Sequence, residues 1–483
     1  MTELAFLSAA QLLAKIKARE VSSLELLDYF WERRQKFDPK LNSIIFDQID
    51  KARERAKAAD AALAKGEDWG PLHGLPMTIK ESYNWVGSPT TWGLPRLKDN
   101  FQEKNAIAVD RLEAAGAVIF GKTNVPLLLS DWQSFNDIYG TTANPWGEGL
   151  IPGGSSGGSA AALAAGLTGL EAGSDIGASI RNPAHYCGVY GHKPTWEAVS
   201  PRGQALPGVL PSTDISVIGP LARSAFDLEL ALKVMMGGDA IDSQAWKIEL
   251  PEPPDKSLKD FKVAIKMDSA VSEVDQEIQE QIFDMAQFLI GEGAQVDFDA
   301  RPAFSDEEIH DVYIALLRSA TSRRQTDEEY QDNIVQVATL SDTDQSYQAS
   351  LLRAYVMSHR DWLGVNQRRH ELRHLWNSFF DDYDVMLCPA AASCAYPHDQ
   401  AGERHERTID VNGRQVPTTD QLFWAGYSGV TLMPSTVAPA GLNSKGLPIG
   451  VQIIGAQYQD LKTIRFAQML EQSYRGFEAP PGY

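Results

Sequence analysis

Three short motifs in this chain have residue types and spacings that could do chemistry. The first is residues 116–123, GAVIFGKT, which fit the phosphate-binding pattern G-x-x-x-x-G-K-[ST]. A phosphate-binding loop follows a strand and precedes a helix, whereas here a helical pattern comes first and the apolar run AVIF indicates a strand. We therefore interpret Gly116 as a helix C-cap that leads into a strand, and not as part of a nucleotide site.

The second motif, HELRH, fits the zinc-hydrolase pattern H-E-x-x-H, with His370 and His374 as ligands and Glu371 as base. At about 100° per residue, a helix places both histidines opposite an apolar stripe. That stripe consists of Leu372, Leu375, Trp376 and Phe379. Zinc catalysis needs the histidines to face a cleft that holds a third ligand. A zinc hydrolase is therefore kept as an alternative, and we expect no metal and no cofactor.

The third motif, GSSGG at residues 154–158, fits the nucleophile elbow G-x-S-x-G. The late histidines that such an elbow needs, His398 and His405, lie in a charged stretch, so a flexible Gly/Ser loop is the simpler interpretation. The motif also belongs to a longer constellation. This consists of HGLPMTIKESYNWVG (73–87), PGGSSGGSAAALAAG (152–166) and GSDIGASIRNPAHYCGVYGHKPT (173–195).

The constellation resembles the amidase signature family of serine hydrolases, which includes fatty acid amide hydrolase, bacterial arylamidases and the A subunit of glutamyl-tRNA amidotransferase. Matching pieces elsewhere are AAGAVIFGKTN before the Gly/Ser run, NPW at 144–146, and YDVMLCPA and LPIGVQIIG near the end. The resemblance therefore covers most of the chain. It implies an α/β fold, a single large domain over 1–483 with a mixed, twisted central sheet surrounded by helices.

The resemblance also implies a Ser–Ser–Lys arrangement made of Lys80 in TIKES, Ser155 in GGSSGG and Ser179 in DIGAS. A serine hydroxyl is a weak nucleophile unless a base takes its proton, and a lysine is a base only when neutral. Burial lowers a lysine pKa from its usual value of about 10.4. Because Lys80 follows the apolar run LPMTI, we expect it at the end of a buried strand. Ser179 would then form an acyl-enzyme while Ser155 protonates the leaving amine.

Residues around the expected nucleophile are assigned by the same resemblance. Backbone N–H groups of Ile176, Gly177 and Ala178 are expected to stabilise the oxyanion. The supporting residues are expected to be Ser156, Asp175 and Arg181. The family usually has glycine where this chain has Ala178, and alanine tolerates a positive φ less well. A cis peptide between Gly154 and Ser155 is also implied.

Aromatic residues flank the signature segments: Trp132, Phe135, Phe423, Trp424 and Tyr427. They could be ordinary core residues, or they could form an apolar pocket for an aryl or alkyl amide, ester or carbamate. Both interpretations stay open. Nothing in the sequence points to a dedicated site for a small charged substrate. The role of the A subunit of a glutamyl-tRNA amidotransferase is kept as an alternative function.

Composition narrows the classes of partner. The chain has 483 residues, with 64 acidic and 44 basic side chains and a net charge of −20. This charge argues against binding to nucleic acid or to an anionic membrane. Three cysteines do not form a disulfide framework, and neither a signal peptide nor a membrane span is recognisable. We expect a cytoplasmic monomer or homodimer that acts on a small-molecule amide.

The elements that must position these residues alternate along the chain. Ser8 and Ser22 or Ser23 are candidate helix caps in an N-terminal helical segment, 1–65, which ends with a helix over 48–65. The signature core is expected over 70–200 and a mostly helical region over 240–380. The last part, 381–483, is expected to contain strands at 383–390, 429–436 and 448–455 and a helix from Asp460.

Overall fold

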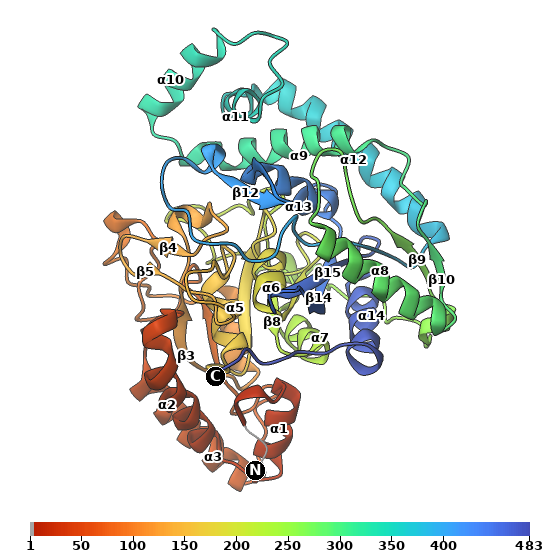
Figure 1. Cartoon of the computed structure of the whole chain (residues 1–483). Coiled ribbons are helices and arrows are strands. Elements are labelled where there is room, and N and C mark those ends of the chain that lie inside the picture. Colours follow the sequence, from red (N-terminus) through yellow and green to blue (C-terminus); the bar gives the residue numbers. More distant parts are fainter. Residues whose placement is uncertain (1–3) are drawn as a thin grey trace.

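The centre of the molecule is a mixed β-sheet, which the computed structural model shows within its described residues, 4–483 (Figure 1). Its strands follow the order β10–β9–β11–β15–β14–β7–β8–β6. Pairing is parallel between β10 and β9 and between β9 and β11, and it is antiparallel between all other neighbours. The strands are β6 (Glu171–Asp175), β7 (Tyr190–Lys193), β8 (Val217–Ala222), β9 (Lys262–Ile265), β10 (Gln295–Asp297), β11 (Val385–Pro389), β14 (Ser435–Leu442) and β15 (Pro448–Ile454).

A three-stranded sheet, in the order β1–β3–β2, lies beside the β6 edge. Its strands are β1 (Ile44–Asp47), β2 (Pro76–Lys80) and β3 (Val118–Thr123). The Thr78 N–H donates to the Leu170 carbonyl at 3.4 Å, and the Gly169 N–H donates to the Pro76 carbonyl at 3.3 Å. These bonds join β2 to the segment that leads into β6. Two small ladders complete the strands: β4 (Phe135–Asn136) with β5 (Gly140–Thr141), and β12 (Thr408–Val411) with β13 (Arg414–Pro417).

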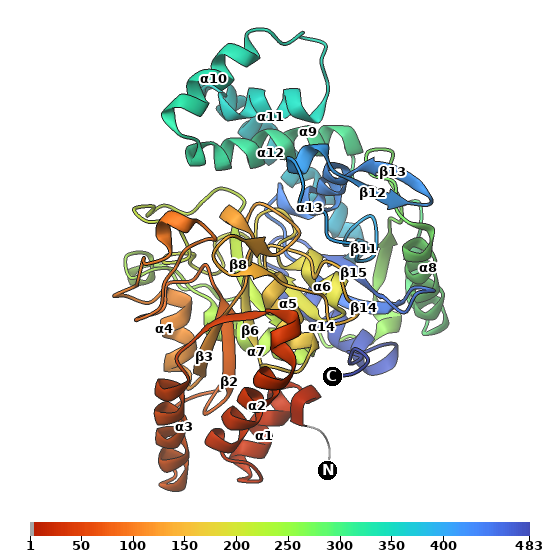
Figure 2. The same cartoon turned by 60° about the vertical axis from the view of Figure 1, so that its left-hand side comes forward.

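Helices surround the sheet, so the predicted α/β class with a mixed central sheet is confirmed. One end of the molecule holds α1 (Ala9–Lys17), α2 (Ser23–Leu41) and α3 (Ile49–Ala64). The other end holds α9 (Asp306–Thr321), α10 (Asp327–Val337), α11 (Tyr347–Tyr355) and α12 (His359–Asp382) (Figures 1 and 2). The remaining helices are α4 (Ile107–Ala114), α5 (Gly157–Ala164), α6 (Arg181–Cys187), α7 (Ala225–Met235), α8 (Gln276–Gly291), α13 (Leu422–Gly429) and α14 (Asp460–Ser473).

Local signals placed the N-terminal helices correctly. Ser8 and Ser22 each cap a helix by accepting a hydrogen bond from the backbone three residues on, and Gln11 and Glu25 complete the capping boxes. The motif at 116–123 is a helix end followed by a strand, as predicted. Gly116 has φ +98°, and a Cβ there would collide with the backbone of His73. This segment is therefore packing structure and not a phosphate loop.

The strand predicted over 429–436 is wrong for most of its length. Helix α13 continues to Gly429, and β14 begins only at Ser435. Residues 422–433 are buried, and a buried helix and a buried strand both show an unbroken apolar run. Hydrophobic periodicity could not separate the two.

The HELRH motif lies on α12, which packs its apolar stripe inward. Leu372, Trp376 and Phe379 are buried, whereas Glu371 and His374 are exposed. Across residues 4–483, no group of three or more His, Cys, Asp or Glu side chains is arranged to hold a metal ion. The zinc-hydrolase alternative therefore lacks a third protein ligand and is not supported. Within the same residues, no helix has the length and apolarity that crossing a membrane requires.

We predict that Trp376→Ala destabilises the fold strongly, since Trp376 packs against Phe304, Phe380 and Tyr427 at centroid distances of 5.6, 5.3 and 5.1 Å. Truncation of a buried tryptophan costs about 3 to 5 kcal/mol. The midpoint of thermal unfolding, measured by differential scanning calorimetry, should fall clearly. His374→Ala, on the exposed side of the same helix, should change stability by less than about 0.5 kcal/mol. Equal losses would contradict the observed orientation of α12.

Candidate active site

The side chain of Lys80 is fully buried at the last position of β2. Its Nζ donates to Ser155 Oγ at 2.7 Å, to Ser156 Oγ at 2.9 Å and to Ser174 Oγ at 2.9 Å. Three hydroxyl groups therefore replace the water that an ammonium group normally has around it. Ser174 was not predicted as a partner, although it lies within the GSDIGAS segment.

Burial lowers the pKa of Lys80 to about 7, although the carboxylates of Asp175, Glu171 and Glu81 act in the opposite direction. No carboxylate makes an ion pair with this lysine among the described residues. A substantial neutral fraction therefore exists near neutral pH, and neutral Lys80 can accept a proton from the hydroxyl of Ser155.

The glycine-rich segment brings Ser155 and Ser156 to Lys80. The Gly154–Ser155 peptide is cis, as expected. A Cβ on Gly154 would collide with the Asp131 carbonyl oxygen, so only glycine fits there. Ser156 is the N-cap residue of α5, but its hydroxyl makes no capping bond and contacts Lys80 instead. Close backbone approach thus explains why this segment needs glycine.

Ser179 lies in the loop between β6 and α6. The Ser156 N–H donates to the Ser179 carbonyl at 3.1 Å, so the two serine-containing loops are joined through their backbones. Ser179 is 5% exposed and lines a pocket of about 30 Å³. The apolar part of the pocket lining consists of Leu129, Trp132, Ile176, Leu317 and Leu422.

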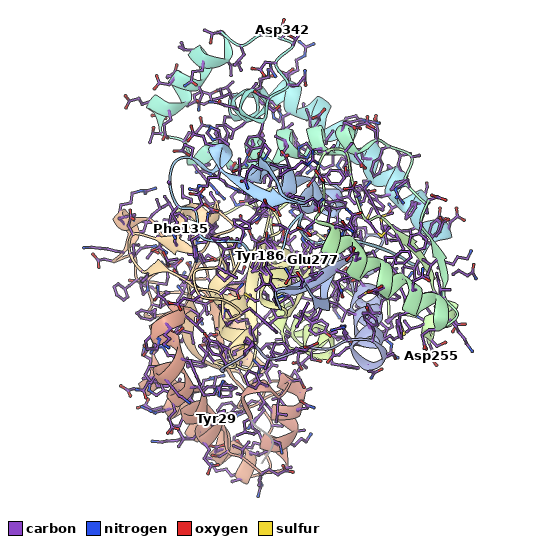
Figure 3. The ribbon with its side chains drawn as sticks, viewed as in Figure 1. Tyr29, Phe135, Tyr186, Asp255, Glu277 and Asp342 are labelled. Carbon is purple, nitrogen blue, oxygen red and sulfur yellow. The ribbon has the colours of Figure 1, made fainter. Side chains whose placement is uncertain are left out.

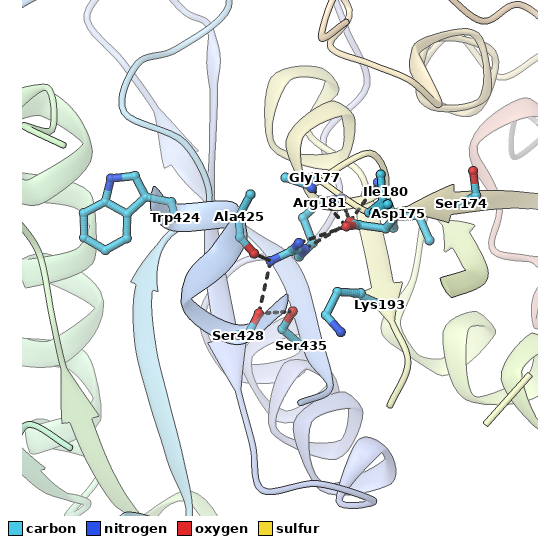
Figure 4. Close-up of polar contacts among 12 residues, drawn as sticks. Ser174, Asp175, Gly177, Ile180, Arg181, Lys193, Trp424, Ala425, Ser428 and Ser435 are labelled. Carbon is cyan, nitrogen blue, oxygen red and sulfur yellow. Dashed lines mark hydrogen bonds and ion pairs between the residues drawn. The ribbon is translucent and has the colours of Figure 1, made fainter. Parts of the chain in front are cut away.

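The buried carboxylate of Asp175 organises the Ser179 loop (Figure 4). It accepts bonds from the N–H groups of Ala178 and Ile180 at 2.9 and 3.0 Å. It also pairs with Arg181, whose Nε and Nη2 lie 3.0 and 2.9 Å away. Burial alone would raise the pKa of Asp175, but the Arg181 guanidinium and the backbone donors hold that pKa below its ordinary value. The carboxylate therefore stays ionised.

Arg181 extends this network across the sheet. Its Nη1 donates to the Ala425 carbonyl at 3.0 Å, to Ser428 Oγ at 3.1 Å and to Gln452 Oε1 at 2.7 Å. The Ser179 loop is thereby tied to α13 and β15, which come from the far end of the sequence. The predicted supporting residues Ser156, Asp175 and Arg181 thus all make hydrogen bonds around the two serine loops.

The backbone N–H groups of the loop differ in availability. Ala178 has φ +65° and its N–H is already bonded to Asp175. Over residues 4–483, the N–H groups of Ile176, Gly177 and Ser179 have no hydrogen-bond partner. Trp132 Nε1 donates to the Gly177 carbonyl at 2.7 Å and Tyr313 Oη donates to the Ile176 carbonyl at 3.0 Å. These two side chains fix the orientation of the Ile176–Gly177 and Gly177–Ala178 peptides.

Of the five predicted pocket aromatics, only Trp132 lines the pocket that contains Ser179. Phe423, Trp424 and Tyr427 are buried in α13 and pack on one another in the core, and the Trp424 indole points away from the Arg181 network (Figure 4). Phe135 belongs to the β4–β5 ladder at the side of the molecule (Figure 3). Four of the five thus lie outside this pocket: three because α13 turns them into the core, and Phe135 because β4 holds it elsewhere.

Several pocket residues were missed by sequence reasoning. They are Leu317, Arg318 and Arg324 from α9 and the turn after it, Arg404, and Leu422. Tyr313, which donates to the Ile176 carbonyl from outside the pocket lining, was missed as well. No motif joins them, since they come from segments more than a hundred residues from Ser179. Together the site offers a buried amine, adjacent hydroxyls, free N–H groups and a small pocket. Such an arrangement can perform nucleophilic substitution at a carbonyl carbon.

Comparison with known proteins agrees with this chemistry. The Amidase family model matches residues 25–464. The indoleacetamide hydrolase of Bradyrhizobium diazoefficiens is 30% identical, over 96% of this chain and 86% of that protein. The A subunit of the glutamyl-tRNA(Gln) amidotransferase of Gloeobacter violaceus is 29% identical, over 98% of each chain. The structure of a bacterial aryl acylamidase of the amidase signature family has a TM-score of 0.82 at 25% identity, over 99% of both chains.

We predict that Asp175→Asn destabilises the protein by about 3 to 5 kcal/mol, because it leaves the buried Arg181 without its counter-charge. The thermal midpoint should fall and the Ser179 loop should lose its anchor. Glu273→Gln is the matched control, since it breaks the more exposed pair with Arg414, which is worth less than about 1 kcal/mol. An Asp175→Asn protein as stable as the Glu273→Gln protein would show that the loop does not depend on this pair.

Proposed function

The chain belongs to the amidase signature family of hydrolases that act on carbon–nitrogen amide bonds, and from that premise we propose that it cleaves apolar or aryl amides through an acyl-enzyme on Ser179. The observation that supports this most is the 2.7 Å contact between the buried Lys80 amine, with its pKa near 7, and the Ser155 hydroxyl. Lys80, Ser155 and Ser179 are the proposed catalytic residues.

The proposed proton route starts at Ser179. Its hydroxyl proton passes to Ser155 Oγ while the proton of Ser155 passes to neutral Lys80 Nζ, and Ser179 Oγ bonds to the substrate carbonyl carbon. When the tetrahedral intermediate collapses, the carbon–nitrogen bond breaks and Ser155 gives a proton to the leaving nitrogen, while Lys80 returns one to Ser155. Water then attacks the acyl-enzyme by the reverse relay, which releases the acid and restores Ser179.

The oxyanion needs donors at the carbonyl oxygen. The N–H groups of Ile176, Gly177 and Ser179 have no partner among residues 4–483 and are therefore available for this role. The Ala178 N–H, which was also expected there, already donates to Asp175. We propose that Ala178 positions the loop instead, with Trp132 and Tyr313 holding the neighbouring carbonyls. Loss of one oxyanion donor typically costs about 3 kcal/mol of barrier.

The apolar side chains beside Ser179 support an apolar or aryl substituent next to the scissile bond. Esters and carbamates present the same electrophilic carbonyl and are further candidate substrates. A second candidate function is that of the A subunit of a glutamyl-tRNA amidotransferase, because relatives of that kind are 28 to 30% identical over nearly the whole chain. Ammonia release from L-glutamine would separate this candidate from an aryl amidase.

The proposed function predicts release of 4-nitroaniline from acyl 4-nitroanilides. Ser179→Ala should abolish turnover, because no other hydroxyl takes its place in the loop, while a chelator should have no effect. Ser378→Ala, an exposed serine on α12, is the matched control and should retain full activity. Activity that persists in Ser179→Ala, or that a chelator removes, would contradict the assignment.

The pKa of Lys80 predicts how activity depends on pH. Because burial lowers this pKa to about 7, the amine is protonated and inactive below pH 7 and neutral above it. The value of kcat/KM should therefore fall about tenfold for each pH unit below 7 and level off above it. Lys80→Met should lower kcat/KM by about 100-fold or more, and its residual activity should lack this inflection. A flat profile between pH 5 and 9 would exclude Lys80 as the base.

A further inference from the structure

Three arginine side chains line the same pocket as Ser179: Arg318 on α9, Arg324 in the turn that follows α9, and Arg404 in the 3₁₀ turn Arg404–Glu406. None of the three makes an ion pair with a carboxylate in the described part of the chain, whereas the buried Arg181, Arg369 and Arg407 each do. An arginine that is removed from water normally has an anionic partner.

Arg404 lies over the pocket aromatic. Its guanidinium carbon is 4.5 Å from the centroid of the Trp132 ring, and its Nη1 donates to the Ser130 carbonyl at 3.1 Å. Its Nε and Nη2 are buried and have no hydrogen-bond partner within residues 4–483. Two donors of a guanidinium fork are therefore unsatisfied, and a carboxylate could accept hydrogen bonds from both.

The hydrogen-bond partners of the other two arginines are also neutral groups. Arg324 Nη1 donates to the Leu128 carbonyl at 2.9 Å and to Ser130 Oγ at 3.0 Å. Arg318 Nη2 donates to the Tyr347 hydroxyl, but its buried Nε has no partner among the described residues. Ser130 thus contacts both Arg324 and Arg404. The three cations lie around one pocket with neutral contacts only.

The acidic residue in the pocket does not balance this charge. Asp131 also lines it, but its carboxylate pairs with Arg407 at 2.6 Å. The pocket therefore has an excess of positive charge in a chain whose net charge is −20. A local field of opposite sign to the whole molecule is a feature of sites that bind anions.

We propose that the substrate has an anionic group, a carboxylate, that binds to Arg318, Arg324 and Arg404 beside the amide that Ser179 attacks. This inference rests on the proposed function and specifies its substrate class: amides that combine an apolar or aryl part with a carboxylate. The planar forks of arginine match a carboxylate in geometry as well as in charge.

The pocket at Ser179 is small, so a substrate that binds there must displace some of the surrounding side chains. The pocket at Ser179 has about 30 Å³, enough to hold about two water molecules. A second hollow of about 140 Å³, lined by Trp92 and the 200–216 segment, shares Arg324 with it. A substrate that brings a carboxylate would draw the flexible arginine side chains toward itself and occupy the space that they vacate.

The test compares amides that differ only in charge. Glutaryl 4-nitroanilide has a carboxylate on the acyl side, and 5-oxohexanoyl 4-nitroanilide replaces it by a methyl ketone of similar size. 4-Acetamidobenzoate places the carboxylate on the amine side, with 4-acetamidoacetophenone, in which a methyl ketone of similar size replaces the carboxylate, as its uncharged partner. The expected kcat/KM ratio, anionic to neutral, is at least about 10 in one of the two pairs, since one hydrogen-bonded charge pair is worth about that factor.

Arg404→Gln and Arg318→Gln should each lower this ratio toward one, and Arg404→Lys should restore part of it. Arg323→Gln is the matched control: it removes the same charge from the exposed neighbour of Arg324 and should leave the ratio unchanged. A ratio near one for both pairs in the unmodified protein, or a ratio that is unaltered in both glutamine variants, would overturn the proposal.

Binding to Ser179→Ala protein separates this proposal from the catalytic one. Isothermal titration with the same compounds reads affinity without turnover. At least about tenfold tighter binding of an anionic compound, lost in Ser179→Ala/Arg404→Gln, supports the carboxylate site even if none of the amides is hydrolysed. Equal affinity for charged and uncharged partners in both pairs would overturn it, whatever the hydrolysis assays show.

Discussion

The amine of Lys80 loses its water when the chain folds, and most of the site follows from that one constraint. A buried ammonium without a paired carboxylate is costly, so the group tends to become neutral. Its remaining donors are satisfied by the hydroxyls of Ser155, Ser156 and Ser174. Ser174 belongs to β6, and Ser155 and Ser156 belong to a loop that must approach β2 closely, which accounts for glycine on both sides of those two serines. The same desolvation leaves a substantial neutral fraction of Lys80 near neutral pH, as the proposed base requires.

A second buried charge keeps the Ser179 loop in place. Asp175 stays ionised because Arg181 and backbone N–H groups surround it, and Arg181 in turn reaches α13 and β15. The two buried ionisable groups thus differ in charge state. Lys80 has only neutral donors and acceptors in direct contact and tends to lose its charge, whereas Asp175 has a cation and keeps its own. The loop that contains Ser179 is therefore held in place while the N–H groups of Ile176, Gly177 and Ser179 have no partner within residues 4–483.

Sequence alone predicted the elements with strong local signals. Capping residues fixed the starts of α1 and α2, and the short apolar run before Lys80 placed that lysine on a buried strand. Sequence analysis failed at α13, where every residue is buried and hydrophobic periodicity is lost. It also failed where contacts depend on tertiary packing. Aromatic residues near the signature could not be divided into core and pocket by type. Arg318, Arg324 and Arg404 could not be assembled at all, because nothing local distinguishes them from surface arginines.

The most direct measurement of the central claim is covalent labelling of Ser179, the proposed nucleophile. The full chain would be treated with a fluorophosphonate, which transfers its phosphonyl group to an activated serine, and then digested and analysed by mass spectrometry. The account predicts one adduct, on the peptide that contains Ser179, formed faster at pH 8 than at pH 6 and strongly slowed in Lys80→Met. An adduct on Ser155 or Ser156 with Ser179 unmodified, or equal labelling of Ser179 without Lys80, would contradict it.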